Sequence, residues 1–152
     1  MKTVLAVLLA LLSIAANAEP RLAGLWQSDR ESTMRFIRER SKLEERTSLF
    51  FEQMTGRLTL EFSKGRLTSS MPSWESVNAE GAKSQLVGFS ETHPFKVVAS
   101  TESQVAVVSQ EPITGRRRVT VYNFDGPNRM WVYLGEAPFP DMNFREYFVR
   151  VK

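Results

Sequence analysis

The chain contains no cysteine among its 152 residues. A disulfide framework and a cysteine-ligated metal site are both excluded, so the fold depends on its hydrophobic core alone. The chain also has one histidine, His93, which precedes Pro94 in an expected turn between strands. Because one histidine without cysteine cannot make a zinc cluster, we expect no metal site.

The usual signatures of catalysis and cofactor binding are also missing. No serine lies in a G-x-S-x-G elbow, and no glycine-rich phosphate loop is present. We therefore expect no enzyme activity and no cofactor. Among the functional hypotheses, an enzyme with a carboxylate-based site ranks last.

The chain has no large excess of charge of either sign. Its 20 basic and 17 acidic residues give a net charge of +3 and are well mixed along the sequence, so we expect no nucleic-acid partner. The local exception is Arg116-Arg117-Arg118, which follows an expected hairpin turn. It is either a solvated turn that keeps a strand edge soluble or an anion site.

The long hydrophobic run is at the start of the chain. Lys2 precedes an apolar stretch from Val4 to Ala15, and Ala16-Asn17-Ala18 has the form of a cleavage site. This pattern predicts a signal peptide over residues 1–18, because about a dozen apolar residues fall short of the ~20 that span a bilayer. We expect export to a periplasm or to the medium, no transmembrane segment in the mature chain, and one domain over residues 19–152.

Helical signals follow a short expected strand at 22–27. Ser28-Asp-Arg-Glu31 and Ser41-Lys-Leu-Glu44 both fit capping boxes, and apolar residues recur at helical spacing up to Met54. Gly56 is placed to end the segment in the left-handed region. The pattern predicts helical structure over 29–55, either as two helices that form a lid or as one continuous helix.

From Arg57 onward the apolar period changes from 3.6 to 2, which predicts strands. Eight or nine short strands are expected, separated by turn residues in the manner of an antiparallel meander. The expected strands cover residues 57–63, 66–70, 74–78, 83–90, 95–100, 104–110, 117–124, 129–135 and 144–152. A first and a last strand that meet would close this meander into a barrel, although a two-sheet sandwich explains the central strands almost as well.

The last strand has two alternating faces, and either could point inward. One face carries Arg145, Tyr147, Val149 and Val151, whereas the other carries Phe144, Glu146, Phe148 and Arg150. If the first face is inward, Arg145 and Tyr147 need an anionic partner. If the second face is inward, Arg150 could pack near Trp26.

The sequence resembles the calycin superfamily, which includes the lipocalins and the fatty-acid-binding proteins. Gly24-Leu25-Trp26 is similar to the G-x-W of the first lipocalin strand, whose Trp packs under an arginine from the end of the barrel, here Arg145 or Arg150. A strand, two helices and a long meander resemble the fatty-acid-binding branch, and Arg145-Glu-Tyr147 resembles its R-x-Y pair. The resemblance implies an antiparallel up-and-down barrel of about eight strands in which Arg145 and Tyr147 bind a ligand carboxylate.

We therefore expect a non-enzymatic, exported binding protein for a small apolar or amphipathic molecule, which could carry a carboxylate. An eight-stranded barrel has room for one small ligand, and aromatic residues would line it. The expected ligand-binding residues are Arg145, Tyr147, Trp131, Tyr133, Phe62 and Phe50, and the expected barrel-closing residues are Gly24, Trp26 and Arg150. The alternative is a protein-binding module, such as an inhibitor of a secreted or periplasmic enzyme, that uses loop residues near Trp74 or Phe139.

Overall fold

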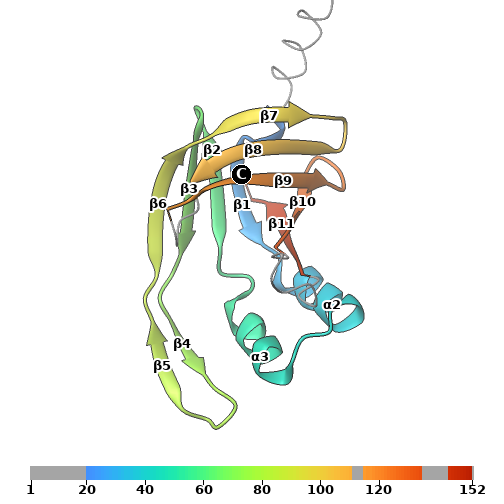
Figure 1. Ribbon diagram of the computed structural model, residues 1–152. Helices are drawn as coiled ribbons and strands as arrows, with labels where there is room; N and C mark the ends of the chain where they lie inside the picture. The colour runs from blue at the N-terminus through green and yellow to red at the C-terminus, as the bar shows by residue number, and fades with distance from the viewer. Residues whose placement is uncertain (1–19, 111–114, 135–143, 152) are drawn as a thin grey trace, which may run out of the picture.

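The fold is mainly β, as the change of apolar period predicts. The computed structural model describes residues 20–110, 115–134 and 144–151; the expected signal peptide and the Pro-rich loop that contains Phe139 lie outside them. One nine-stranded antiparallel sheet curls into a nearly closed barrel (Figure 1). Its strands are β1 (Gly24–Ser28), β2 (Thr59–Ser63), β3 (Arg66–Met71), β6 (Phe89–Pro94), β7 (Lys96–Ser100), β8 (Gln104–Gln110), β9 (Arg117–Phe124), β10 (Arg129–Tyr133) and β11 (Arg145–Arg150).

The first and last strands meet inside this sheet. The strand order is β6-β3-β2-β1-β11-β10-β9-β8-β7, and the pairing of β1 with β11 places Trp26 opposite Arg150. The expected closure by the two ends of the chain is therefore confirmed. The seam of the barrel lies between β6 and β7, which follow one another in the chain and are joined through Phe95, whose N–H donates to the carbonyl of Gly65.

Two further strands extend one hairpin beyond the barrel. β4 (Trp74–Val77) pairs with β5 (Lys83–Leu86) in a separate two-stranded sheet that continues β3 and β6 (Figure 1). The expected single strand over 83–90 is wrong, because the chain breaks pairing at Val87-Gly88 and begins β6 at Phe89.

The expected turn at His93-Pro94 is also wrong, because both residues belong to β6. The strand hydrogen-bonds on one side only, to β3, so that it is an edge strand of the sheet. A proline at the end of an edge strand removes no ladder hydrogen bond that the sheet needs.

Two helices cover the lower end of the barrel in Figure 1. α2 (Arg30–Arg40) begins at Asp29, whose carboxylate accepts from the backbone N–H of Ser32 at 3.1 Å. α3 (Glu45–Met54) begins after Glu44, which makes no side-chain cap. Two separate helices are thus confirmed. The expected N-caps at Ser28 and Ser41 are wrong, because the helices begin after Asp29 and Glu44.

The interior has two packed regions. The first lies inside the barrel and comprises Leu22, Trp26, Leu60, Phe62, Leu67, Val105, Val107, Tyr122, Met130, Val132 and Phe148. The second joins α2, α3 and the start of β11 through Met34, Ile37, Phe51 and Phe144.

Candidate ligand-binding cavity

A cavity of about 920 Å³ lies inside the lower part of the barrel. Its lining is mainly apolar and comes from β2, β3, β8, β9, β10 and β11, together with α3 and the β4–β5 hairpin. The volume is at the upper end of the range for sites that bind small molecules. The inward members of these strands include Leu60, Leu67, Ser69, Ser109, Tyr122, Val132, Glu146 and Phe148.

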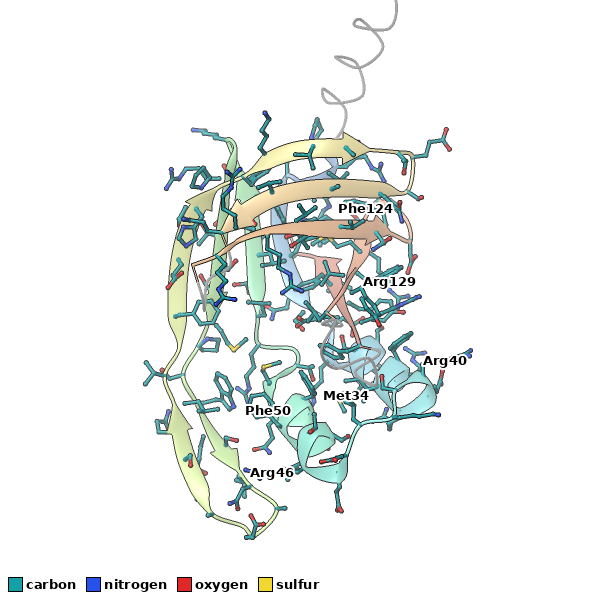
Figure 2. The ribbon with its side chains drawn as sticks, in the orientation of Figure 1. Met34, Arg40, Arg46, Phe50, Phe124 and Arg129 are labelled. Atoms are coloured by element: carbon teal, nitrogen blue, oxygen red, sulfur yellow. The ribbon has the colours of Figure 1, made fainter. Side chains whose placement is uncertain are left out.

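The cavity opens between α3 and the hairpin. Phe50 on α3 is 43% exposed and Val87 at the hairpin is 84% exposed, although both border the cavity. Met54, Trp74 and Phe89 complete this rim. Figure 2 shows Phe50 on α3 and Met34 on α2 at the lower end of the barrel. Apolar side chains at the rim would let an apolar molecule enter without crossing a polar barrier.

The rim is held by a pair of hydrogen bonds between α3 and β4. The side-chain amide of Gln53 donates to the carbonyl of Val77 at 2.8 Å and accepts from its N–H at 2.7 Å. One donated and one accepted hydrogen bond to the same backbone residue is also the pattern between paired strands, and here it joins the hairpin to the helix. The Arg57 guanidinium lies 5.7 Å from the ring centroid of Trp74 and adds a contact on the same side.

Glu146 places a carboxyl group against this apolar lining. Its side chain is 4% exposed, and Oε1 accepts a hydrogen bond from the Ser28 hydroxyl at 2.7 Å. The Ser28 oxygen in turn accepts from the N–H of Gly56 at 2.9 Å. The other carboxyl oxygen, Oε2, receives no hydrogen bond from a described residue and is not among the fully buried unpartnered atoms, so it is accessible from the cavity. Burial raises the pKa of Glu146 to about 7, and the Ser28 hydrogen bond opposes that rise.

The upper end of the barrel is closed by Arg150 and Trp26. The guanidinium lies 4.3 Å from the centroid of the fully buried Trp26 ring and donates to the carbonyls of Arg21, Ala23 and Pro127. The indole N–H donates to the Leu22 carbonyl at 2.7 Å. Nearby, Gly24 has a φ of 116°, a conformation that residues with a side chain rarely adopt. The three residues expected to close the barrel therefore lie together at one end.

Arg145 and Tyr147 lie on the outer face of β11. The Arg145 guanidinium lies 3.9 Å from the Trp131 centroid and 4.9 Å from that of Phe36, and Arg129 covers the Tyr147 ring at 4.9 Å. We define these five residues as the outer arginine–aromatic cluster. Neither arginine has a carboxylate within 4.0 Å among the described residues, so cation–π contacts hold both side chains.

The expected ligand-binding residues divide between three places. Phe50, Trp131 and Tyr133 border the cavity, although register aligns Trp131 and Tyr133 with the outward residues Tyr147 and Arg145. The Trp131 ring stacks with the outward Arg145, so these two residues border the cavity as part of the β10 wall. Phe62 belongs to the packed core, with its ring 5.2 Å from that of Tyr122. Arg145 and Tyr147 do not line the cavity, so the expected carboxylate site has no place inside the barrel.

Sequence reasoning missed the polar group of the cavity. Strand alternation predicts the face of Glu146 but not its burial, and the capping-box pattern predicts Ser28 as a helix cap and not as a partner of Glu146. The available signal was an acidic residue between Phe144 and Phe148 on one alternating face, since a carboxylate flanked by aromatic residues on a buried face needs a partner.

Other classes of site receive no support from the described part of the chain. It contains no group of three or more residues of the kinds that bind metals. None of its helices is long and apolar enough to cross a membrane.

Comparison with known proteins leaves the family open. A scan against protein-family models gives no match, and searches of curated proteins and of solved structures give none either. The nearly closed antiparallel barrel with two helices after its first strand fits a calycin-like fold at the level of architecture.

Proposed function

We propose that the protein binds a small apolar or amphipathic molecule inside the barrel. The observation that carries this proposal is the cavity of about 920 Å³, with an apolar lining and an apolar rim between α3 and the hairpin. Side chains pack the upper end of the barrel, so the lower end is the route by which a ligand enters. Binding would remove apolar surface of both partners from water, at about 25 cal/mol per Å².

The proposal extends to a lipocalin-like relationship and to export. The Gly24-Leu25-Trp26 motif, the arginine stacked on its Trp and the helix pair after the first strand support the relationship. The apolar stretch and small-residue site in residues 1–18 support export to a periplasm or to the medium.

The test fills the cavity and measures binding of the neutral fluorescent probe N-phenyl-1-naphthylamine. Ser69 is buried on β3 and borders the cavity, so Ser69→Trp should reduce probe affinity at least tenfold by occupying the site. Ser109→Trp on β8 should do the same from the other side of the seam between β6 and β7. The matched control is Ser63→Trp, at an exposed position of β2 outside the lining, which should bind as the wild type does.

Melting temperatures of all variants establish that each is folded. If the folded Ser69→Trp and Ser109→Trp variants both bind the probe as tightly as the wild type, the cavity is not the binding site.

A wild-type protein that binds no probe would instead favour the second candidate, a protein-binding module. For that function the outer arginine–aromatic cluster and the exposed side chains of Val119, Val121 and Tyr133 are the relevant surface.

A further inference from the structure

The carboxyl group of Glu146 gives the cavity a site that accepts hydrogen bonds. The Ser28 oxygen accepts a hydrogen bond from the N–H of Gly56, and its hydroxyl group donates one to Glu146 Oε1, so both hydrogen bonds run toward the carboxyl group. Oε2 has no donor among the described residues. Because Glu146 lines the cavity and Oε2 is not fully buried, a donor supplied by a ligand can reach that oxygen and offset part of the cost of burying the carboxyl group.

Among the described residues that line the cavity, Glu146 is the one acidic residue. Arg118, Tyr122 and Tyr133 are the remaining titratable residues of the lining. Arg118 and Tyr122 belong to β9, and Tyr122 is buried in the packed core. In the sheet, Glu146 pairs with Val132 of β10, and its β1 neighbour is Ser28, so neither adjacent strand places a cation beside it.

We propose that the ligand of the cavity is an amphipathic amine whose ammonium group binds Glu146 and whose apolar chain lies along the lining toward the rim. This inference rests on the proposed function, because it assigns a head group to the same ligand. Ammonium donates up to three hydrogen bonds and supplies the opposite charge, so one Oε2 contact is charge-assisted. Burial raises the pKa of Glu146 and so disfavours its ionised form, and an adjacent ammonium group would favour that form again.

The anionic ligand implied by the R-x-Y resemblance makes the opposite prediction. A carboxylate head group beside Glu146 would bring two like charges together in a buried site, which is unfavourable unless one of them is protonated. The net charge of +3 also attracts anions and repels cations nonspecifically. A preference for the amine would therefore have to arise at the site itself.

The experiment compares dodecylamine, dodecanol and dodecanoic acid as competitors of N-phenyl-1-naphthylamine at pH 7.5, at concentrations below those at which they form micelles. We expect the wild-type protein to bind dodecylamine at least tenfold more tightly than either analogue, since a buried charge-assisted hydrogen bond contributes about one to two factors of ten. Glu146→Gln should abolish that preference while retaining dodecanol binding within about threefold. Glu61→Gln, at an exposed position on β2, is the matched control and should retain the preference.

The outcomes separate this inference from the proposed function. If the three compounds bind the wild type equally, or if Glu146→Gln keeps the preference for the amine, the cavity binds apolar chains but Glu146 does not select the head group. If the wild-type protein binds neither the probe nor, in a direct titration, any of the three compounds, the proposed function fails and this inference fails with it. The melting temperature of Glu146→Gln shows whether this variant is folded. If it is not, Glu146→Asp, which keeps the charge, is the second variant to measure.

Discussion

Glu146 lies between Phe144 and Phe148 on the face of β11 that is turned to the interior, and all three are nearly inaccessible to solvent. Its only hydrogen-bond donor among the described residues is Ser28, which also accepts the N–H of Gly56 after α3. One side chain thus connects β1, β11 and the end of the helical segment. The carboxyl group is uncharged more often than an exposed one would be, because burial raises its pKa to about 7.

The raised pKa predicts that stability falls as the pH rises from about 4.5 to about 7. In this window the folded protein holds a proton on Glu146 that the unfolded chain has already released, so rising pH favours unfolding. The contribution is roughly 3 kcal/mol, fully present below the lower pH and lost above the upper one. Glu146→Gln keeps an acceptor for Ser28 but cannot titrate, so its free energy of unfolding should lack this decline.

Urea denaturation at intervals between pH 4 and pH 8 measures the effect. Other carboxylates titrate over the same range, so the informative quantity is the difference between wild type and variant. Glu61→Gln, which removes an exposed carboxylate from β2, should leave the wild-type decline in place. Parallel curves for wild type and Glu146→Gln would show that the carboxyl group has an ordinary pKa.

At the scale of elements, the hairpin that forms one wall of the cavity changes partners at Gly88. A Cβ atom on this residue would lie 2.4 Å from the Met71 carbonyl oxygen and 2.5 Å from the Ser73 backbone nitrogen. The N–H of Gly88 donates to the Ser73 hydroxyl at 2.8 Å. The segments around Gly88 and Met71–Ser73 therefore pass at a distance that only glycine allows. At this point strand pairing changes from β3–β6 to β4–β5.

Gly88→Ala should separate these two segments and displace the β4–β5 hairpin from the rim. We expect a loss of roughly 1–3 kcal/mol, the usual cost of overpacking, together with weaker binding of N-phenyl-1-naphthylamine. Gly81→Ala at the hairpin tip is the control, since a Cβ there meets nothing within 4 Å; it should lose stability through its φ of 83° but bind the probe normally. Wild-type stability and binding in Gly88→Ala would refute the close approach.

At the scale of the whole molecule, Arg150 connects three parts of the chain that are distant in sequence. It extends from the last strand to the carbonyls of Arg21 and Ala23 before β1 and to that of Pro127 between β9 and β10. The same guanidinium covers Trp26. These contacts fix the upper end of the barrel, and partial burial lowers the pKa of Arg150.

Arg150→Lys should reduce stability although it keeps the charge. Lysine cannot present a planar fork to several carbonyls or stack on the indole, so we expect a loss of about 2 kcal/mol and a fall of roughly 5–10 °C in Tm. The control is Arg35→Lys on α2, which alters a solvent-exposed pair with Glu31 and should change Tm by less than about 2 °C. Equal melting temperatures for both variants would mean that Arg150 does not hold the closed end.

The sequence by itself determined the order of the helical and strand-rich regions and indicated how the barrel closes. Periods of 3.6 and 2 are local consequences of how side chains are arranged on helices and strands, so two helices and a strand-rich remainder could be predicted from them. The position of Gly24-Leu25-Trp26 and of the last strand indicated that the two ends of the chain would pair. Local propensity failed at β6, where a proline is accepted because the strand is an edge, which is a property of the assembled sheet.

Tertiary structure alone decided which face of the last strand is buried. Both alternating sets contain apolar and charged residues, with Val149 and Arg145 on one and Phe148 and Glu146 on the other. The choice follows from the register of β11 against β1, which aligns Phe148 with Ser28 and Arg150 with Trp26. Because a shift of one residue would exchange the two faces, the position of a neighbouring strand determined that Glu146, and not Arg145, lies in the cavity.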